Sequence, residues 1–450
     1  MSNFVKNHLL LNKFDKIKKI LIIGEAMKFD TKLLHAGYNP EEHNMCINVP
    51  IYPTTAFDFG DVQRGADLFD LKCEGDIYTR LSNPTNNIFE NRLAELEGGI
   101  GALSFSSGQA ATTASILNIT QSGQEVVAAS TLYGGTCNLF SSTFKKLGID
   151  VKFAKGEEPE DFEREITDKT RCIFIELLSN PALNIIDIEK LAKVAHSHNI
   201  PLIVDNTIPS PYLCNPIKWG ADIVVHSTTK YISGHGNAMG GIVVDSGNFD
   251  WEKSGKFPEL TTPDESYHGI VYTQSFGKSA YIIKARAQIL RDLGSCPSPF
   301  NSYLAISGLE TLSLRMQRHC DSALKLAKWL DNHPDINWVN YPMLESNKYY
   351  NLAQKYTPKG CSSIIGFGLK GGAKAGEKFI SALKIPIFTT NIGDTRSIIT
   401  YPYITTHRQL SDEQMKACGV TDDFMRFSVG LEDIDDIIED FEQAIRFSQK

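Results

Sequence analysis

The chain has 450 residues, enough for two or three domains at roughly 150 residues each and for a large buried core. An apolar share of 42% and a charged share of 22% are those of a globular protein and exclude disordered and fibrous classes. The 53 acidic residues outnumber the 45 basic ones, and the net charge of −8 argues against a surface for nucleic acid or anionic membranes.

Membrane spans and cysteine-based sites are not expected either. No apolar run approaches the roughly 18 residues that a membrane helix requires. The nine cysteines are scattered without a C-x-x-C pair, so neither a disulfide framework nor a zinc site is predicted. We therefore expect a cytoplasmic protein in a reducing compartment, with neither nucleic acid nor membrane among its partners.

The first 26 residues differ in character from the rest of the chain. They carry five lysines and two acidic residues, but neither the apolar core and cleavage site of a signal peptide nor the arginine and serine bias of a transit peptide. We interpret residues 1–26 as an extra N-terminal tail and Met27 as the natural start. Mass spectrometry of the native protein tests this, because a peptide from residues 1–19 would contradict it.

Short β-branched strands alternate with helical segments over the middle of the chain. The expected strands are 102–105, 125–129, 172–176, 201–204 and 222–225. Helices are expected from Gln109, from Tyr133 to Lys146 and from Asp187. This alternation predicts an α/β fold with a mostly parallel sheet covered on both faces. Helical patterns at 302–332, a strand at 363–369 and a helix from Ile434 predict a smaller C-terminal α/β domain.

Several polar groups follow the expected strands, where parallel sheets bind their ligands. These groups are the turn Ser107-Gly108-Gln109, Tyr133, Asp205 and the segment Ser227-Thr228-Thr229-Lys230. Taken singly, each has an ordinary explanation as a helix cap, a packing residue or a solvated surface group. Together they provide a phosphate cradle, an aromatic plate, a buried anion and an amine.

Pyridoxal phosphate requires this combination of groups. A lysine amine forms a Schiff base with its aldehyde, and an aspartate keeps its ring nitrogen protonated. At about 4 Å and an effective dielectric near 20, that ion pair is worth about 4 kcal/mol. The hydroxyls of Ser227 and Thr229 and the amides of Gly108 and Gln109 are the candidate phosphate ligands.

Nucleotide and metal sites fit the sequence less well. It contains no G-x-x-x-x-G-K-[ST] match and no complete G-x-G-x-x-G match. The pair His196 and His198 lies in an expected helix, and neither His226 nor His235 has ligand spacing around it. We therefore assign no metal.

Longer sequence segments between Thr31 and Ile445 make the chain resemble the Cys/Met-metabolism family of pyridoxal-phosphate enzymes. The stretches include PIYPTTAFDF (50–59), ADLFDLKCEGDIYTRLSNPT (66–85), SFSSGQAA (104–111), STLYGGT (130–136), VHSTTKYISGHGNAMGGIVVD (225–245) and MRFSVGLED (425–433). Within the family the chain is most similar to the O-acetylhomoserine sulfhydrylase branch. The resemblance implies the fold-type I architecture and γ-replacement of O-acetyl-L-homoserine by sulfide or methanethiol, giving homocysteine or methionine and acetate.

The resemblance also implies a role for each matching residue. It makes Lys230 the Schiff-base lysine, Asp205 the partner of the ring nitrogen, Tyr133 the stacked tyrosine, and Ser227, Thr229, Gly108 and Gln109 the phosphate ligands. It also implies that Arg426 binds the substrate carboxylate and that Asn180 and Asn391 line the cofactor and this carboxylate. Tyr78 and Arg80 are implied to contact the cofactor phosphate of the neighbouring subunit. Lys230 and Tyr133 are the expected catalytic residues.

The implied assembly is a homotetramer built from dimers that share their active sites. In this interpretation residues 27–85 form an arm that reaches the neighbouring subunit. Residues 86–298 form the cofactor-binding domain and residues 299–450 the C-terminal domain.

Related enzymes catalyse γ-elimination (methionine γ-lyase) or use cysteine as the nucleophile (cystathionine γ-synthase). The lyase-like motif has a cysteine two residues after the stacked tyrosine, where this chain has Gly135, and the insert at 250–296 resembles the sulfhydrylase branch. One departure is YPYITTH at 401–407, in place of the HPASTTH usual for the branch. Tyr401, Tyr403 and Ile404 are bulkier than the residues usual at these positions in the branch, so they affect the size of acceptor that is expected. The remaining alternative is a catalytically silent protein that acts in assembly. Such a protein would be expected to have lost the lysine, the aspartate or the carboxylate-binding arginine, but Lys230, Asp205 and Arg426 are all retained.

Overall fold

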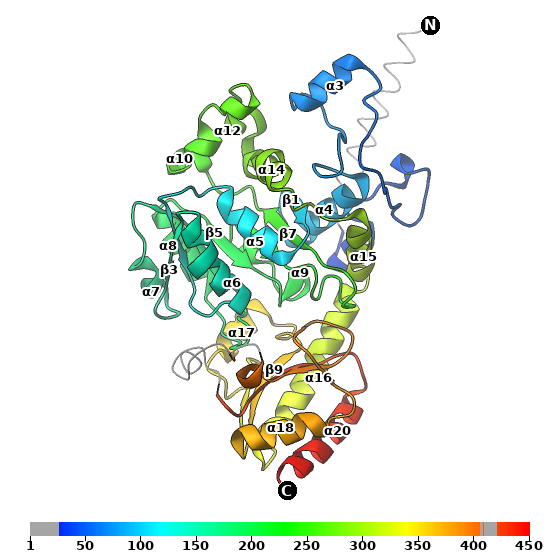
Figure 1. The fold of residues 1–450 in the computed structure, drawn as a ribbon, viewed down its shortest axis with the longest axis vertical. Coiled ribbons are helices and arrows are strands. Elements are labelled where there is room, and N and C mark those ends of the chain that lie inside the picture. The colour runs from blue at the N-terminus through cyan, green and yellow to red at the C-terminus, as the bar shows by residue number, and fades with distance from the viewer. Residues whose placement is uncertain (1–26, 406–407, 409–420) are drawn as a thin grey trace.

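The computed structural model describes residues 27–405, 408 and 421–450, so the predicted tail and the motif residues Thr406 and His407 lie outside the described residues. Two sheets organise the chain, one above the other in Figure 1. The larger lies between residues 101 and 245 and the smaller between residues 336 and 428, within the predicted domains 86–298 and 299–450. The division at those boundaries remains a prediction.

The larger sheet has seven strands in the order β1-β7-β6-β5-β4-β2-β3. Its strands are β1 (Gly101–Phe105), β2 (Glu125–Ala128), β3 (Asp150–Phe153), β4 (Thr170–Glu176), β5 (Leu202–Asp205), β6 (Ile223–His226) and β7 (Gly241–Asp245). Strands β2 to β6 are parallel, and β7 runs antiparallel to β6 and β1. The predicted mostly parallel sheet is confirmed. The sequence patterns did not indicate β3, a partly exposed edge strand, or β7.

Helices surround this sheet and continue into the N-terminal segment (Figure 1). Between residues 27 and 298 the α-helices are α2 (Phe29–His35), α3 (Val62–Phe69), α4 (Pro84–Glu97), α5 (Gly108–Leu117), α6 (Gly134–Asn138), α7 (Pro159–Glu163), α8 (Ile188–Ser197), α9 (Ser210–Leu213), α10 (Trp251–Ser254), α11 (Pro258–Thr261), α12 (Tyr272–Phe276), α13 (Ala280–Lys284) and α14 (Arg291–Leu293). Short 3₁₀ or π segments are η1 (Pro40–Glu42), η2 (Leu139–Phe144), η3 (Pro216–Trp219), η4 (Glu265–Tyr267), η5 (Gly277–Ser279) and η6 (Ala285–Leu290).

Local sequence explains where the helices at the strand ends begin. Ser107 caps α5 by accepting a hydrogen bond from the amide of Ala110 at 3.1 Å. Asp187 caps α8 in the same way through the amide of Lys190, at 3.4 Å. Past η2, Gly148 has φ +78°, a left-handed conformation that favours glycine. The helical segment predicted to end at this glycine is therefore present as α6 and η2.

The smaller sheet has five strands in the order β10-β11-β12-β9-β8. They are β8 (Ile336–Asn340), β9 (Ile364–Leu369), β10 (Ile387–Phe388), β11 (Ile398–Thr400) and β12 (Phe424–Ser428). The remaining elements are α15 (Pro299–Leu309), α16 (Leu312–Asp331), α17 (Tyr350–Tyr356), α18 (Gly372–Ala382), η7 (Pro402–Ile404) and α20 (Ile434–Ser448). The helical pattern at 302–332 is divided between α15 and α16, and α20 begins at the predicted Ile434.

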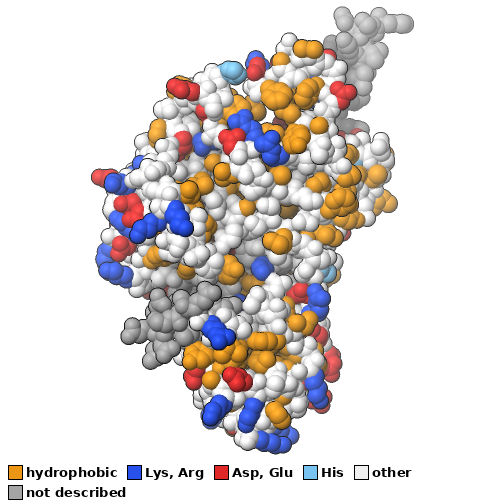
Figure 2. Space-filling model, in the orientation of Figure 1, with side chains coloured by type: hydrophobic (Ala, Val, Ile, Leu, Met, Phe, Trp, Pro, Cys, Tyr) orange, Lys and Arg blue, Asp and Glu red, His pale blue; other side chains and the backbone are white. Residues whose placement is uncertain are grey.

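The core lies around the central strands, while the N-terminal segment leaves apolar side chains in solvent. The apolar side chains of β4, β5 and β6 are fully buried. In contrast, Ile47 is 97% exposed, and Val62 and Phe69 of α3 are 91% and 60% exposed. Figure 2 shows apolar side chains gathered at the end of the molecule where α3 lies. None of the described helices is long and apolar enough to cross a membrane.

Candidate active site

Two carboxylates meet at the ends of neighbouring strands. Glu176 ends β4 and Asp205 ends β5, and the two residues are direct partners in the parallel ladder. Burial raises the pKa of both carboxyls, and the charge of Asp205 adds to the effect on Glu176. Asp205 accepts a hydrogen bond from the amide of Thr207 at 2.9 Å, and no described cationic side chain pairs with it. A buried carboxylate without a counter-ion favours a protonated nitrogen in the ligand.

Lys230 follows β6, and its amine lies across from the smaller sheet. The Nζ atom donates a hydrogen bond to Asn391 Oδ1 at 2.7 Å. Burial, together with the positive charge of Arg426, lowers the pKa of Lys230 to about 8. About a tenth of the amine is therefore unprotonated at pH 7, far more than for an ordinary lysine, and the unprotonated form is the nucleophile.

Loss of the Lys230 amine should change the alkaline stability of the cofactor-free protein. The folded pKa of about 8 lies below the ordinary 10.5, so the unfolded chain binds more protons between these values and stability rises with pH across that window. Lys230→Met should reduce this rise by about 2 kcal/mol between pH 8 and pH 10. Urea denaturation near pH 8 and near pH 10 measures it, with the exposed Lys218→Met as control. Equal slopes for Lys230→Met and wild type would contradict the lowered pKa.

Arg426 on β12 is a buried cation held by neutral groups. Its Nη1 donates to Asn180 Oδ1 at 3.0 Å, and its Nη2 donates to the Asn391 carbonyl at 3.1 Å and to Thr400 Oγ1 at 2.8 Å. The side chain is 8% exposed, its Nε has no partner, and no described carboxylate pairs with it. Burial lowers its pKa to about 10, so it stays charged at neutral pH. The uncompensated guanidinium is suited to bind a carboxylate.

The start of α5 packs closely against the turn after β6. A Cβ atom on Gly108 would lie 2.6 Å from the Cβ of Ser227, so only glycine permits this approach. The Ser227 amide donates to Thr207 Oγ1 at 2.8 Å, and Thr229 Oγ1 bonds both the amide and the carbonyl of Gly240, at 3.1 and 3.2 Å. Free amides at the start of a ten-residue helix, beside two hydroxyl side chains, form a cradle for a phosphate.

Tyr133 lies at the start of α6, beside Gln109. Its amide donates to Glu176 Oε1 at 2.6 Å, and its ring is half exposed. A Cβ atom on Gly135 would lie 2.5 Å from Tyr133 Cε1 and 2.6 Å from Gln109 Nε2. Gly135 therefore allows the tyrosine ring and the Gln109 amide to approach each other.

Gly135→Cys should disturb the Tyr133 ring and lower kcat/KM by about 10- to 100-fold, because a displaced aromatic plate no longer orients the reacting groups. The measurement is steady-state kinetics of the purified protein. Gly134→Ala is the matched control, since nothing lies within 4 Å of a Cβ atom there. Unchanged kinetics in Gly135→Cys would show that the ring position is not limiting.

Glu176 and Thr400 are site residues that sequence reasoning missed. Besides the Tyr133 amide, Glu176 accepts a hydrogen bond from the Asn180 amide at 3.3 Å, so one carboxylate connects the stacking tyrosine to the residue that holds Arg426. The available signal for Glu176 was an acid at the end of an apolar central strand. Thr400 had no such signal, because only the pairing of β11 with β12 places it opposite Arg426.

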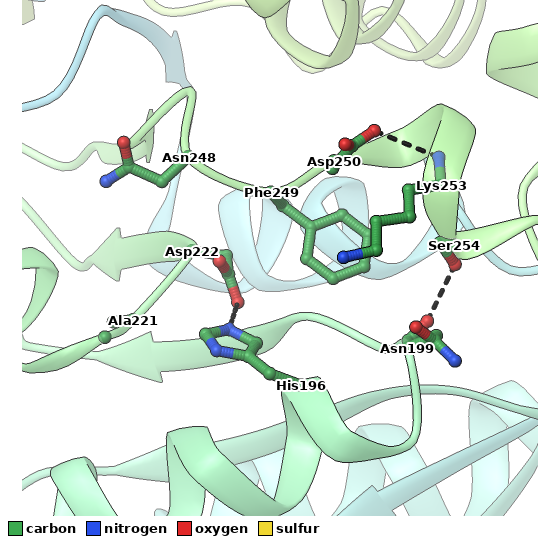
Figure 3. Close-up of a pocket in the computed structure, with 10 residues that line it drawn as sticks. His196, Asn199, Ala221, Asp222, Asn248, Phe249, Asp250, Lys253 and Ser254 are labelled. Atoms are coloured by element: carbon green, nitrogen blue, oxygen red, sulfur yellow. Dashed lines mark hydrogen bonds and ion pairs between the residues drawn. The ribbon is translucent and has the colours of Figure 1, made fainter.

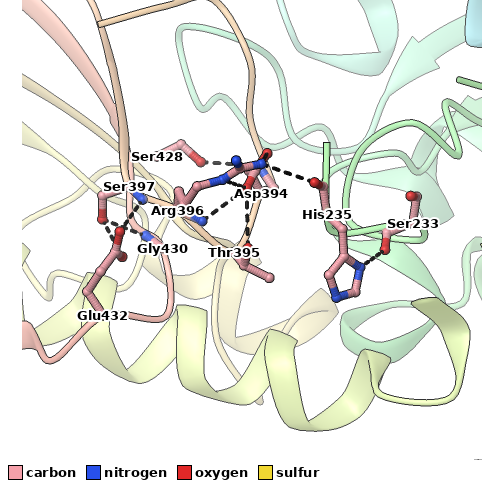
Figure 4. A network of polar contacts seen from close by, with 10 residues as sticks. Ser233, His235, Asp394, Thr395, Arg396, Ser397, Ser428, Gly430 and Glu432 are labelled. Atoms are coloured by element: carbon pink, nitrogen blue, oxygen red, sulfur yellow. Dashed lines mark hydrogen bonds and ion pairs between the residues drawn. The ribbon is translucent and has the colours of Figure 1, made fainter. Parts of the chain in front are cut away.

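A polar network holds the loop that carries Asn391 (Figure 4). Arg396 bonds Asp394 through Nε and Nη2, and its Nη2 also donates to the His235 carbonyl at 3.1 Å. Glu432 accepts hydrogen bonds from the amide and hydroxyl of Ser397 at 2.7 and 2.9 Å. The loop of the smaller sheet is thus attached to the segment that follows Lys230.

Tyr78 and Arg80 lie in the N-terminal segment, apart from this cluster. The Arg80 guanidinium is 5.5 Å from the centre of the Tyr78 ring, and its Nη1 donates to the Arg291 carbonyl at 2.5 Å. Among the described residues, neither side chain bonds to Lys230 or Asp205 of the same chain. Their expected contribution to a neighbouring site remains a prediction.

The bulky residues of the 401–407 motif do not all lie on the same side of the chain as Arg426. Tyr401 is fully buried, and its hydroxyl donates to the Asp422 carbonyl. Successive residues of an extended chain point in opposite directions, so Thr400 faces Arg426 while Tyr401 faces away. Tyr403 packs beside Phe424, in the smaller domain. Tyr401 therefore points away from Arg426, and the effect of the 401–407 motif on the acceptor stays a prediction.

The pocket in Figure 3 lies at the other edge of the larger sheet, near the start of β5 and β6. Its volume is about 200 Å³. His196 Nε2 lies 2.8 Å from Asp222 Oδ2, and His198 Nε2 lies 3.1 Å from Glu163 Oε1. Both histidines thus have carboxylate partners. Over the described ranges, no cluster of three or more histidine, cysteine or acidic side chains is arranged to hold a metal ion.

The fold and the site define a pyridoxal-phosphate-dependent enzyme of fold-type I. The uncompensated Asp205, the Lys230 amine and the close approach of Gly108 to Ser227 fit that cofactor's ring nitrogen, aldehyde and phosphate. The chain belongs to the Cys/Met metabolism PLP-dependent enzyme family, whose model matches residues 30–446.

Similar proteins cover nearly the whole chain. The O-acetyl-L-homoserine sulfhydrylase of Leptospira meyeri is 48% identical over 436 residues, covering 94% of this chain and 98% of that protein. The homocysteine synthase of Schizosaccharomyces pombe is 46% identical and covers 94% and 99%. A crystal structure of a putative O-acetylhomoserine (thiol)-lyase from Campylobacter jejuni has a TM-score of 0.91 at 38% identity, covers 93% and 100%, and contains a pyridoxyl-lysine monophosphate.

Proposed function

We propose that the chain is an O-acetyl-L-homoserine sulfhydrylase, which replaces the acetate of O-acetyl-L-homoserine by sulfide and releases L-homocysteine. The observation that carries the proposal is that one asparagine, Asn391, contacts both the amine that would act as the base and the arginine that would bind the substrate carboxylate. Lys230 Nζ binds Asn391 Oδ1, and Arg426 binds the Asn391 carbonyl. Similarity to proteins of that name over more than 90% of both chains supports the choice of substrate.

The residues divide the work in this proposal. Pyridoxal phosphate, when bound, supplies an electron sink for the substrate. Arg426 binds the substrate α-carboxylate through the guanidinium donors that its protein contacts leave open, Nε among them, and so orients Cα toward Lys230. Lys230 is the Schiff-base lysine, and its freed amine moves the proton at Cα and later the protons at Cβ, general acid–base work worth about 10²–10⁴ in rate. With the cofactor bound, Tyr133 would stack on its ring and Asp205 would hold its ring nitrogen.

The test is a single assay of purified protein with pyridoxal phosphate and O-acetyl-L-homoserine, with and without sulfide. Homocysteine and 2-oxobutyrate are followed together. Homocysteine that depends on sulfide, with little oxoacid, is the expected result. Oxoacid formed without sulfide would replace the proposal by γ-elimination. Methanethiol and O-succinyl-L-homoserine in parallel assays decide the acceptor and the donor.

The proposed assembly is a cytoplasmic homotetramer made of dimers that share active sites. Tyr78 and Arg80 reach the cofactor phosphate in the partner, from the arm 27–85. The exposed apolar side chains of this arm, among them Ile47 and Val62, support an interface there, because a second subunit would remove them from water.

Hybrid oligomers should reveal shared sites. Arg80→Ala and Lys230→Ala variants, each nearly inactive alone, should regain about a quarter of the wild-type activity when they are unfolded, mixed and refolded together. Half of the dimers are then hybrids, and each hybrid has one site with both residues intact. Activity no greater than the sum of the separate variants would mean that Arg80 serves its own subunit. The exposed Arg64→Ala, also in the arm, is the control partner for mixing.

A further inference from the structure

A second polar cavity lies at the far end of the helix that begins in the active site. Its volume is about 300 Å³, and it is enclosed by residues 117–121 and the segment from Glu259 to Gln288. Helix α5 runs from Gly108 in the active site to Leu117 at the cavity, a length of about 15 Å. The cavity therefore shares no lining residue with the site described above.

Two polar side chains of the cavity lack partners. Both carboxylate oxygens of Glu259, on α11, are buried, and neither accepts a hydrogen bond from another described residue. Thr120 is 4% exposed, and its hydroxyl has no partner either. A buried carboxylate without hydrogen bonds costs several kcal/mol and is rare in stable folds. These groups leave two carboxylate oxygens and one hydroxyl free for a ligand.

A buried cation, Lys284, faces the same cavity without pairing with Glu259. Its side chain is 5% exposed, and its Nζ donates to the Asn118 carbonyl at 2.9 Å and to Asn118 Oδ1 at 3.4 Å. Burial lowers its pKa to about 8, and the charges of Glu259 and Asp264 act in the opposite direction. An ammonium has three donors, so one remains for a ligand.

The second acid at the cavity is already satisfied. Asp264 accepts hydrogen bonds from the Tyr272 hydroxyl at 3.0 Å, from the Ser266 hydroxyl at 2.8 Å and from Gln288 Nε2. Because Asp264 is already hydrogen-bonded, Glu259 is the acidic side chain of the cavity whose oxygens still lack a donor. Lys284 and Thr120 are the side chains that can still donate a hydrogen bond. The lining of the cavity therefore includes one unpaired acidic group and one partly paired amine.

We propose that this cavity binds a small zwitterion, a free amino acid whose ammonium sits on Glu259 and whose carboxylate sits on Lys284 and Thr120. A ligand with both charges satisfies all three side chains at once, whereas a simple cation or a simple anion leaves one charge unanswered. The proposal is independent of the proposed function, because it uses no residue of the active site.

Calorimetry and thermal melting of the full-length holoenzyme test the proposal. The probes are glycine, β-alanine and 4-aminobutyrate, which separate ammonium and carboxylate by increasing distances, with propylamine and butyrate as single-charge controls. Saturable binding of at least one zwitterion, at least about tenfold tighter than both single-charge probes, is expected. Binding at the active site would alter the visible absorption of the cofactor, so it is followed in the same samples. An absence of saturable binding in the millimolar range would mean that the cavity holds only water.

Variants locate the site within the cavity. Glu259→Gln and Lys284→Met should each weaken zwitterion binding at least about tenfold, and Thr120→Val should weaken it less. Glu252→Gln and Lys278→Met, exposed positions in the same insert, are the matched controls and should bind as wild type does. Wild-type affinity in Glu259→Gln and Lys284→Met would overturn the proposal. Melting temperatures and cofactor absorption of the variants confirm that each is folded, and Thr120→Val provides a test with no charge change.

Discussion

Lys230→Ala should lower turnover by at least about 10³-fold while the protein remains folded, because the variant loses the amine that moves the substrate protons. Burial lowers the pKa of this amine to about 8, so it can act as a base near neutral pH. Steady-state assay of homocysteine formation measures the loss. The visible absorption of the purified variant should also change, since its cofactor no longer has a lysine partner.

The control for this experiment is Lys218→Ala, an exposed lysine that lies before β6, at the other edge of the larger sheet. It should retain wild-type turnover. An Lys230→Ala variant that turns over at more than a tenth of the wild-type rate would refute the assignment of Lys230. A cofactor-free Lys230→Ala protein with an unchanged circular-dichroism spectrum confirms that the loss is chemical.

Arg426→Leu should reduce kcat/KM for O-acetyl-L-homoserine by about 10²–10³-fold, mainly through KM, because the substrate carboxylate loses a buried charge-assisted contact worth about 3–4 kcal/mol. Arg426→Lys should recover only part of this loss. A lysine keeps the charge, but its single ammonium does not reproduce the fork that bonds Asn180, Asn391 and Thr400 at the same time.

Arg318→Leu is the matched control, since Arg318 is exposed on α16 of the same domain. It should bind substrate as wild type does. If Arg426→Leu changed kcat alone and left KM unchanged, Arg426 would position other groups and would not bind the carboxylate. Thr400→Val separates these roles further, because it removes one contact of the guanidinium and keeps the charge.

The sequence predicted the part of the site that depends on strand ends. Asp205 ends β5 and Lys230 follows β6, and the carboxyl ends of these neighbouring parallel strands lie at one edge of the sheet, so local patterns place both residues at that edge. Family resemblance added Arg426, Asn180 and Asn391. The structure places the three together, with bonds across as many as 246 residues of chain.

Other features depend on pairing between distant segments and have no local signal. Thr400 faces Arg426 only because β11 and β12 pair in one register, and a shift of one residue would present Tyr401 instead. The direction of β7 relative to its neighbours was not evident either, since a short apolar strand has the same sequence pattern in a parallel and in an antiparallel pair. In the sequence Glu176 is only an acidic residue at the end of a strand, and its role is evident only from the two amides that donate hydrogen bonds to it in the structure.

The neutral partners of Arg426 have a consequence for the resting enzyme. Asparagine and threonine oxygens hold the guanidinium but leave its charge uncancelled, and its Nε has no partner. Such a pocket is suited to attract small anions, so we expect acetate released by the reaction to compete with the next substrate molecule for the same arginine. In that case the catalytic rate would depend on the local anion composition as well as on the supply of substrate.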